Sequence, residues 1–166
     1  NPGKGYNIYE CKGKKIGVIN LIGRTSMSVL SENPFLVAKQ IVSEIKKQVD
    51  IIIIDFHAEA TAEKIALGYY LDGEITVLFG THTHVQTSDS RILPNGTAYI
   101  TDVGMTGPLD GVIGTKKEII INRFINNDKQ LFQPQDTGRK QFCAIIVEIN
   151  DSTHKVTNID RINVLE

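Results

Sequence analysis

The chain has 166 residues, of which 41% are hydrophobic and 22% are charged, and its 18 basic and 19 acidic side chains give a formal net charge of −1. This composition is ordinary for a globular protein and argues against disorder over the whole chain, and the length favours a single domain over residues 1–166. No basic block is present that would follow a nucleic-acid backbone, so bulk nucleic acid is not indicated as a ligand.

A membrane span is not predicted either. The longest apolar stretch, VDIIIIDF, is interrupted by Asp50 and Asp55 and is far shorter than the ~20 residues that a spanning helix needs. No secretory leader is recognised, and the two cysteines, Cys11 and Cys143, do not form a disulfide framework. We therefore expect a cytoplasmic protein without membrane contact.

The first half of the sequence alternates predicted strands and helices. Residues 14–23 form an apolar strand that ends at a glycine, and a helix follows with Asn33 as its N-cap and Pro34 at its first position. The four isoleucines at 51–54 indicate a strand buried on both faces. A helix over 61–70 and a strand over 74–80 complete a pattern typical of α/β proteins with parallel strands.

After residue 90 the pattern changes, and it gives the C-terminal part α+β character. No further strand and helix alternate there, and two adjacent strands are joined by a short turn, as in an antiparallel hairpin. The predicted elements are a strand over 97–102, a glycine-rich loop over 104–115, a helix over 116–125 and a hairpin around the turn 151–154.

Polar residues follow two consecutive predicted strands, in the segments DFHAEAT and GTHTHVQT. Because neighbouring parallel strands end at the same edge of a sheet, we expect His57 to lie close to His82 and His84. If residues 82–84 are extended, the two histidines point to one side with Cα atoms ~6.5–7 Å apart. Imidazole nitrogens bind Zn, Mn or Fe, so the three histidines are predicted metal ligands.

Other polar residues near these histidines have more than one role open to them. Asp55 and Glu59 could be ligands, hydrogen-bond partners of a histidine or helix-start carboxylates. Asp102 could reach the same sheet edge or stabilise a turn, and His154 is expected to be a solvent-exposed loop histidine. The candidates for hydrogen bonds to the ligands are Asp55, Glu59, Thr81 and Thr83.

The quoted motifs also carry a family resemblance. INLIGRT, DFHAEATAEKIALGYYLDG, GTHTHVQTSDSRILPNGTAYITDVGMTGP and DGVIG resemble the YmdB-like bacterial metallophosphoesterases of the calcineurin superfamily, which hydrolyse 2′,3′-cyclic and other cyclic nucleotides. The resemblance implies a β-sandwich flanked by helices and two divalent ions (Fe, Mn or Zn) at the strand ends. It also implies His57, His82 and His84 as metal ligands, and attack of a metal-bound hydroxide on the phosphorus of a phosphodiester substrate.

The resemblance is incomplete, because three family motifs are absent: Gly-Asp-Val-x-Gly, Gly-Glu-Asn and Gly-Asn-His. They would supply the remaining metal ligands and the histidine that protonates the leaving oxygen, so the catalytic residue is unknown here. We expect the C-terminal portion of a metallophosphoesterase domain, inactive or weakly active alone, whose uncovered apolar surface promotes self-association.

Two alternatives to this interpretation stay open. One is a non-enzymatic metal-binding or regulatory fragment. The other is a metal-dependent amidohydrolase, which is disfavoured because residues 85–166 contain a single histidine and end in a hairpin.

Overall fold

The main feature of the computed structural model, which describes residues 3–28 and 30–166, is a six-stranded sheet in the order β1-β2-β3-β4-β6-β5. The four central strands are parallel, and β1 and β5 pair with their neighbours in the antiparallel sense. The strands are β1 (Tyr6–Cys11), β2 (Lys14–Ile22), β3 (Ile51–His57), β4 (Val77–Thr81), β5 (Arg91–Ile92) and β6 (Ala98–Ile100).

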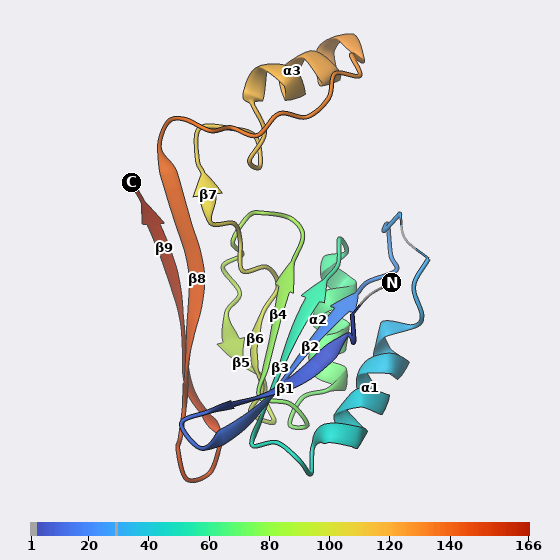
Figure 1. Ribbon diagram of the computed structural model, residues 1–166, viewed down its shortest axis with the longest axis vertical. Helices are drawn as coiled ribbons and strands as arrows, with labels where there is room; N and C mark the ends of the chain where they lie inside the picture. The colour runs from blue at the N-terminus through green and yellow to red at the C-terminus, as the bar shows by residue number, and fades with distance from the viewer. Residues whose placement is uncertain (1–2, 29) are drawn as a thin grey trace.

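Two helices join the parallel strands and lie on the same side of the sheet (Figure 1). They are α1 (Pro34–Ile45) and α2 (Thr61–Tyr70), both at the positions that the sequence predicts. The predicted N-cap is confirmed, since the Asn33 side chain accepts a hydrogen bond from the backbone N–H of Phe35. Between the helices and the sheet lies the core, which includes the fully buried Ile19, Val42, Ile54, Phe56 and Leu67.

The prediction that the isoleucine strand is buried on both faces was wrong. Along β3, Ile52, Ile54 and Phe56 are buried beneath the helices, whereas Ile51, Ile53, Asp55 and His57 alternate with them and stay partly exposed. A continuous run of β-branched residues shows strand propensity on both faces, but burial depends on whether another layer covers each face. The partly exposed face carries the polar end of the strand.

A second sheet with the order β7-β8-β9 extends along β5 and β6 of the main sheet (Figure 1). Its strands are β7 (Gly107–Pro108), β8 (Lys140–Ile149) and β9 (Val156–Leu165), and the predicted antiparallel hairpin is confirmed. Gln86 joins the two sheets, because its Nε2 donates to the carbonyls of Val103, Ala144 and Ile162. The predicted helix near the C-terminal part is α3 (Lys117–Asn126), which stands apart from the main sheet.

The mixed α/β architecture with a two-sheet arrangement therefore matches the sequence prediction. The short strands β1, β5 and β7 were not predicted. Within residues 3–28 and 30–166, no helix combines the length and apolar character that crossing a membrane would take. That the whole chain forms one domain stays a prediction.

Candidate metal centre

The candidate site lies where β3 and β4 end side by side. His57 is the last residue of β3 and Thr81 is the last residue of β4, and the two are paired in register. The next residue, His82, brings its Nδ1 to 3.0 Å from Nε2 of His57, with the ring planes at 86°. The predicted proximity of His57 and His82 is thus confirmed, and it follows from the parallel register of the two strands.

A hydrogen-bonded chain fixes the protonation of the His57 ring. The Thr81 hydroxyl donates to Oδ1 of Asp55 at 2.8 Å, and Nδ1 of His57 lies 3.0 Å from the same hydroxyl oxygen. Since the single hydroxyl proton points to the carboxylate, the hydroxyl oxygen accepts a hydrogen bond from the protonated Nδ1 of His57. The Nε2 atom of His57, which faces His82, is then left with a free lone pair.

The same reasoning applies to His82. Its Nε2 lies 3.0 Å from Oε2 of Glu59, and the two side chains are 35% and 50% exposed. An ionised carboxylate only accepts hydrogen bonds, so Nε2 of His82 carries a proton, and in the neutral ring Nδ1 has the lone pair. Thr81 therefore contacts His57 and Glu59 contacts His82, and Asp55 acts on His57 through the Thr81 hydroxyl. Metal-binding histidines are oriented by hydrogen bonds of this kind.

Two unprotonated nitrogens facing each other at 3.0 Å repel one another unless a cation lies between them. Nitrogen atoms bound to one divalent ion at about 2.1 Å, and at a right angle, are themselves about 3.0 Å apart. The separation of His57 Nε2 and His82 Nδ1 thus fits two ligands of a single ion. A proton shared between the rings is the other cation that would relieve the repulsion.

His84 differs from the expectation. Residues 82–84, here named the histidine turn, are not extended, because His82 and His84 have φ angles of 114° and 65°. The Nδ1 atom of His84 donates to the carbonyl of Ile113 at 3.0 Å, which leaves its Nε2 free beside a cavity of about 190 Å³. In the part of the chain that the structure describes, no group of three histidine, cysteine or acidic side chains is placed to hold one metal ion.

The histidine turn is hydrogen-bonded to Asp102, whose role the sequence left undecided, and further residues near the site were not predicted at all. The backbone N–H of Thr83 donates to Oδ2 of Asp102, which also pairs with Lys64 in the core. Lys64 was not predicted, although it lies three residues before the buried Leu67 on the same helical face. Asn20, one strand further away, donates to Oδ2 of Asp55 and was also missed.

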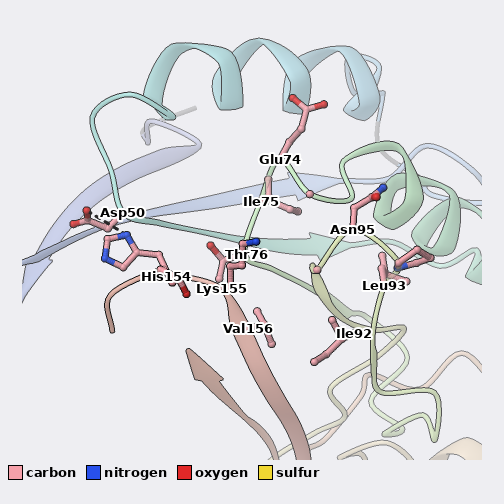
Figure 2. A pocket seen from close by; sticks show the side chains of 14 residues that line it. Asp50, Glu74, Ile75, Thr76, Ile92, Leu93, Asn95, His154, Lys155 and Val156 are labelled. Carbon is pink, nitrogen blue, oxygen red and sulfur yellow. Dashed lines mark ion pairs between the residues drawn. The ribbon is translucent and has the colours of Figure 1, made fainter. Parts of the chain in front are cut away.

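A separate pocket of about 580 Å³ lies at the opposite end of the main sheet, where the parallel strands begin (Figure 2). Figure 2 shows His154 beside Asp50. Nδ1 of His154 lies 3.7 Å from Oδ1 of Asp50. Lys14 Nζ lies 3.0 Å from Nε2 of His154, whose side chain is only 29% exposed. The expectation of a solvent-exposed His154 was therefore wrong, because its hairpin packs against the start of β2 and β3.

Similar proteins align with nearly all of this chain. A 2′,3′-cyclic-nucleotide 2′-phosphodiesterase of Bacillus subtilis is 50% identical over 97% of the chain, which corresponds to 60% of that protein. Among solved structures, a hypothetical protein from Thermus thermophilus matches 100% of the chain and 64% of its own, with 36% identity and a TM-score of 0.91. A Mycoplasma pneumoniae protein described as a novel phosphatase matches 99% of the chain and 58% of its own, with 38% identity and a TM-score of 0.89.

The chain spans between 58% and 60% of the length of the curated relatives that it matches. The model of the family described as YmdB-like protein matches residues 1–162, which include the histidine turn and the ends of β3 and β4. With nearly every residue matched, the chain belongs to the YmdB-like protein family.

Proposed function

We propose that this chain is part of a metal-dependent phosphodiesterase that hydrolyses 2′,3′-cyclic or other cyclic nucleotides. The observation that carries the proposal is the 3.0 Å separation of His57 Nε2 and His82 Nδ1, which suits two ligands of one divalent ion. The name of the Bacillus subtilis relative, a 2′,3′-cyclic-nucleotide 2′-phosphodiesterase, supports the substrate class. A divalent ion at this position would supply positive charge to the phosphoryl oxygens of a substrate.

Each predicted residue has a role in this proposal except Thr83, whose hydroxyl donates to the carbonyl of Val85 and not to a histidine. His57 and His82 bind one ion, and His84, whose Nε2 is free, binds a second ion in the complete site. Asp55 acts through Thr81 to orient His57, and Glu59 orients His82. The metals are Fe, Mn or Zn, all of which accept imidazole ligands.

The remaining ligands and the acid catalyst would come from the part of the relatives that this chain does not cover. Residues 3–28 and 30–166 hold no cluster of three potential ligands, so we expect the chain alone to bind a divalent metal weakly. We also expect little phosphodiesterase activity from it. In the described residues the main sheet is open and its order ends at β1 and β5, which argues against an amidohydrolase barrel.

Metal binding is tested by calorimetric titration of the chain with Zn²⁺ and Mn²⁺. Replacing His57 or His82 by Ala removes one of the two nitrogens and should abolish measurable binding. The matched control is His154→Ala, which removes a histidine from the other end of the sheet and should leave the affinity unchanged. Equal binding by all four proteins would contradict the proposed ligands.

Activity separates the enzyme from a metal-binding or regulatory module. The assay compares 2′,3′-cyclic AMP hydrolysis by the 166-residue chain and by a protein extended to the length of the Bacillus subtilis relative. We expect turnover only from the extended protein, and its loss when His82 is replaced. Robust turnover by the 166-residue chain would refute the proposed dependence on further ligands, and inactivity of the extended protein would favour a binding role.

Self-association is proposed through the partly exposed sheet face and the free edge of β1. Tyr9 on this edge strand is 54% exposed, and Ile22 at the end of β2 is 37% exposed. An uncovered strand edge and an apolar face both favour pairing with a second copy. Light scattering should show dimers or larger species, with a shift to monomer on Tyr9→Lys; a monodisperse monomer for the unmodified chain would contradict this.

We further propose that the protein works in the cytoplasm. Both cysteines are free, with Cys11 exposed and Cys143 buried, as is usual where thiols are kept reduced. Fractionation of cells that make the protein, followed by detection in each fraction, tests this location. Recovery from the membrane or extracellular fraction would count against it.

A further inference from the structure

A fully buried ion pair lies beneath the histidine turn. Nζ of Lys64 is 3.0 Å from Oδ2 of Asp102, and both side chains are 0% exposed. The same carboxylate oxygen accepts a hydrogen bond from the backbone N–H of Thr83 at 2.9 Å, and Oδ1 accepts one from the backbone N–H of Gly104 at 2.9 Å. The carboxylate therefore connects α2, the histidine turn and the loop that follows β6.

Stability alone is a poor reason for this pair. Removing two charges from water is costly, and apolar side chains of similar volume often serve as well or better in a protein core. The site also needs room, because the alkyl chain of Lys64 crosses β4 at Gly80, where a Cβ atom would lie 2.8 Å from Lys64 Cδ. Three elements of the fold thus accommodate one charged pair.

The backbone conformation of the histidine turn indicates a role for the pair of Lys64 and Asp102. His82 and His84 both have positive φ angles, a region that side chains with a Cβ atom rarely adopt. Such strained residues persist only where surrounding contacts hold them. The hydrogen bond from Thr83, the residue between them, to Asp102 is placed to hold both.

We propose that Lys64 and Asp102 are positioning residues whose buried pair holds the histidine turn, so that His82 Nδ1 is directed at His57. The proposal rests on the proposed metal role of His57 and His82. Lys64 pairs with the Asp102 carboxylate and orients it, and the carboxylate fixes the turn through Thr83. Neither residue contacts the metal or the substrate in this scheme.

The test is the double substitution Lys64→Met with Asp102→Asn, which removes both charges together and leaves no unpaired charge in the core. The matched control is Asp72→Asn. Asp72 also accepts two backbone hydrogen bonds, from Asn95 and Thr97, but it lies at the opposite end of the sheet. Three quantities are measured: amide hydrogen exchange of Thr83, the ¹³Cα chemical shifts of residues 82–84, and Zn²⁺ affinity.

We expect the double variant to keep the thermal midpoint of the control, to exchange the Thr83 amide faster and to shift the Cα signals toward those of ordinary negative φ angles. Its Zn²⁺ affinity should fall by about tenfold or more, as for other residues that orient metal ligands. Unchanged exchange, shifts and affinity would overturn the proposal. If the unmodified chain does not bind Zn²⁺, the proposed function fails, and exchange and Cα shifts decide the positioning role by themselves.

A second variant covers the case in which the double variant does not fold. Thr83→Pro removes the same backbone N–H without substituting either member of the buried pair. Loss of Zn²⁺ affinity and of the unusual Cα shifts supports the proposal, and retention of both overturns it.

Discussion

Thr81→Val tests how the ligands of the proposed metal are oriented. The substitution preserves the shape of the side chain and removes the hydroxyl that donates to Asp55 and accepts from His57. A hydrogen bond to a charged group contributes about 1.5–3 kcal/mol when buried. Because Thr81 is only half-buried, water can replace part of this, and we expect the free energy of unfolding to fall by about 1 kcal/mol.

We expect Thr81→Val to weaken metal binding by a larger free energy than it lowers the free energy of unfolding. Without the hydroxyl, His57 can place its proton on Nε2, the atom that faces His82, and the lone pair for the metal is lost. Residues that orient metal ligands typically change metal affinity by about 10–100-fold, and partial exposure places Thr81 near tenfold, or about 1.4 kcal/mol.

Calorimetry with Zn²⁺ measures the affinity, and ¹⁵N NMR of the imidazole rings identifies the protonated nitrogen of His57. Thr81→Ser retains the hydroxyl and is the matched control, so it should bind Zn²⁺ like the unmodified chain. If Thr81→Val and Thr81→Ser bind equally and the His57 ring keeps its proton on Nδ1 in both, the assigned hydrogen-bonded chain is not what orients the ligand.

Two further predictions concern stability. Gly80→Ala would place a Cβ atom against the backbone carbonyl of Thr101, so we expect a loss of about 3 kcal/mol in a denaturant titration. Gly17→Ala would clash with the flexible end of Ile45 and touch Val49 at ordinary contact distance, so it should cost less, and equal losses would refute the clash at Gly80. Burial raises the pKa of Asp89, but hydrogen bonds from Thr101 and Thr87 outweigh it and hold that pKa below 3.8. The stabilising contribution of Asp89 is therefore complete above pH 3.8 and is lost as the pH falls through the lowered pKa. Asp89→Asn should weaken the loss of thermal stability at acid pH, and an unchanged acid dependence of the thermal midpoint would contradict this.

Much of the fold could be predicted because the relevant signals are local. Asn33 and Pro34 mark the start of α1, and the spacing of apolar residues identifies both helices that cover the sheet. The closeness of His57 and His82 could also be predicted, since it depends only on two consecutive parallel strands being neighbours. Register then brings their polar ends together.

The parts that could not be predicted depend on contacts between residues far apart in the sequence. The positive φ angles of His82 and His84 accompany a hydrogen bond from Thr83 to Asp102, 19 residues away, which no local pattern reveals. This is why the expectation of an extended histidine turn failed. His154 was misjudged for the same reason, because its partial burial depends on Lys14 at the other end of the chain.

The most direct measurement is ¹⁵N NMR of the imidazole rings during a Zn²⁺ titration of the chain, with His154 as an internal reference. We predict that free His57 is protonated at Nδ1 and free His82 at Nε2, and that Zn²⁺ shifts His57 Nε2 and His82 Nδ1 together. The His154 signals should not move. Zn²⁺ that shifts only His154, or a titration in which the facing nitrogens of His57 and His82 do not respond, would contradict a metal centre at the ends of β3 and β4.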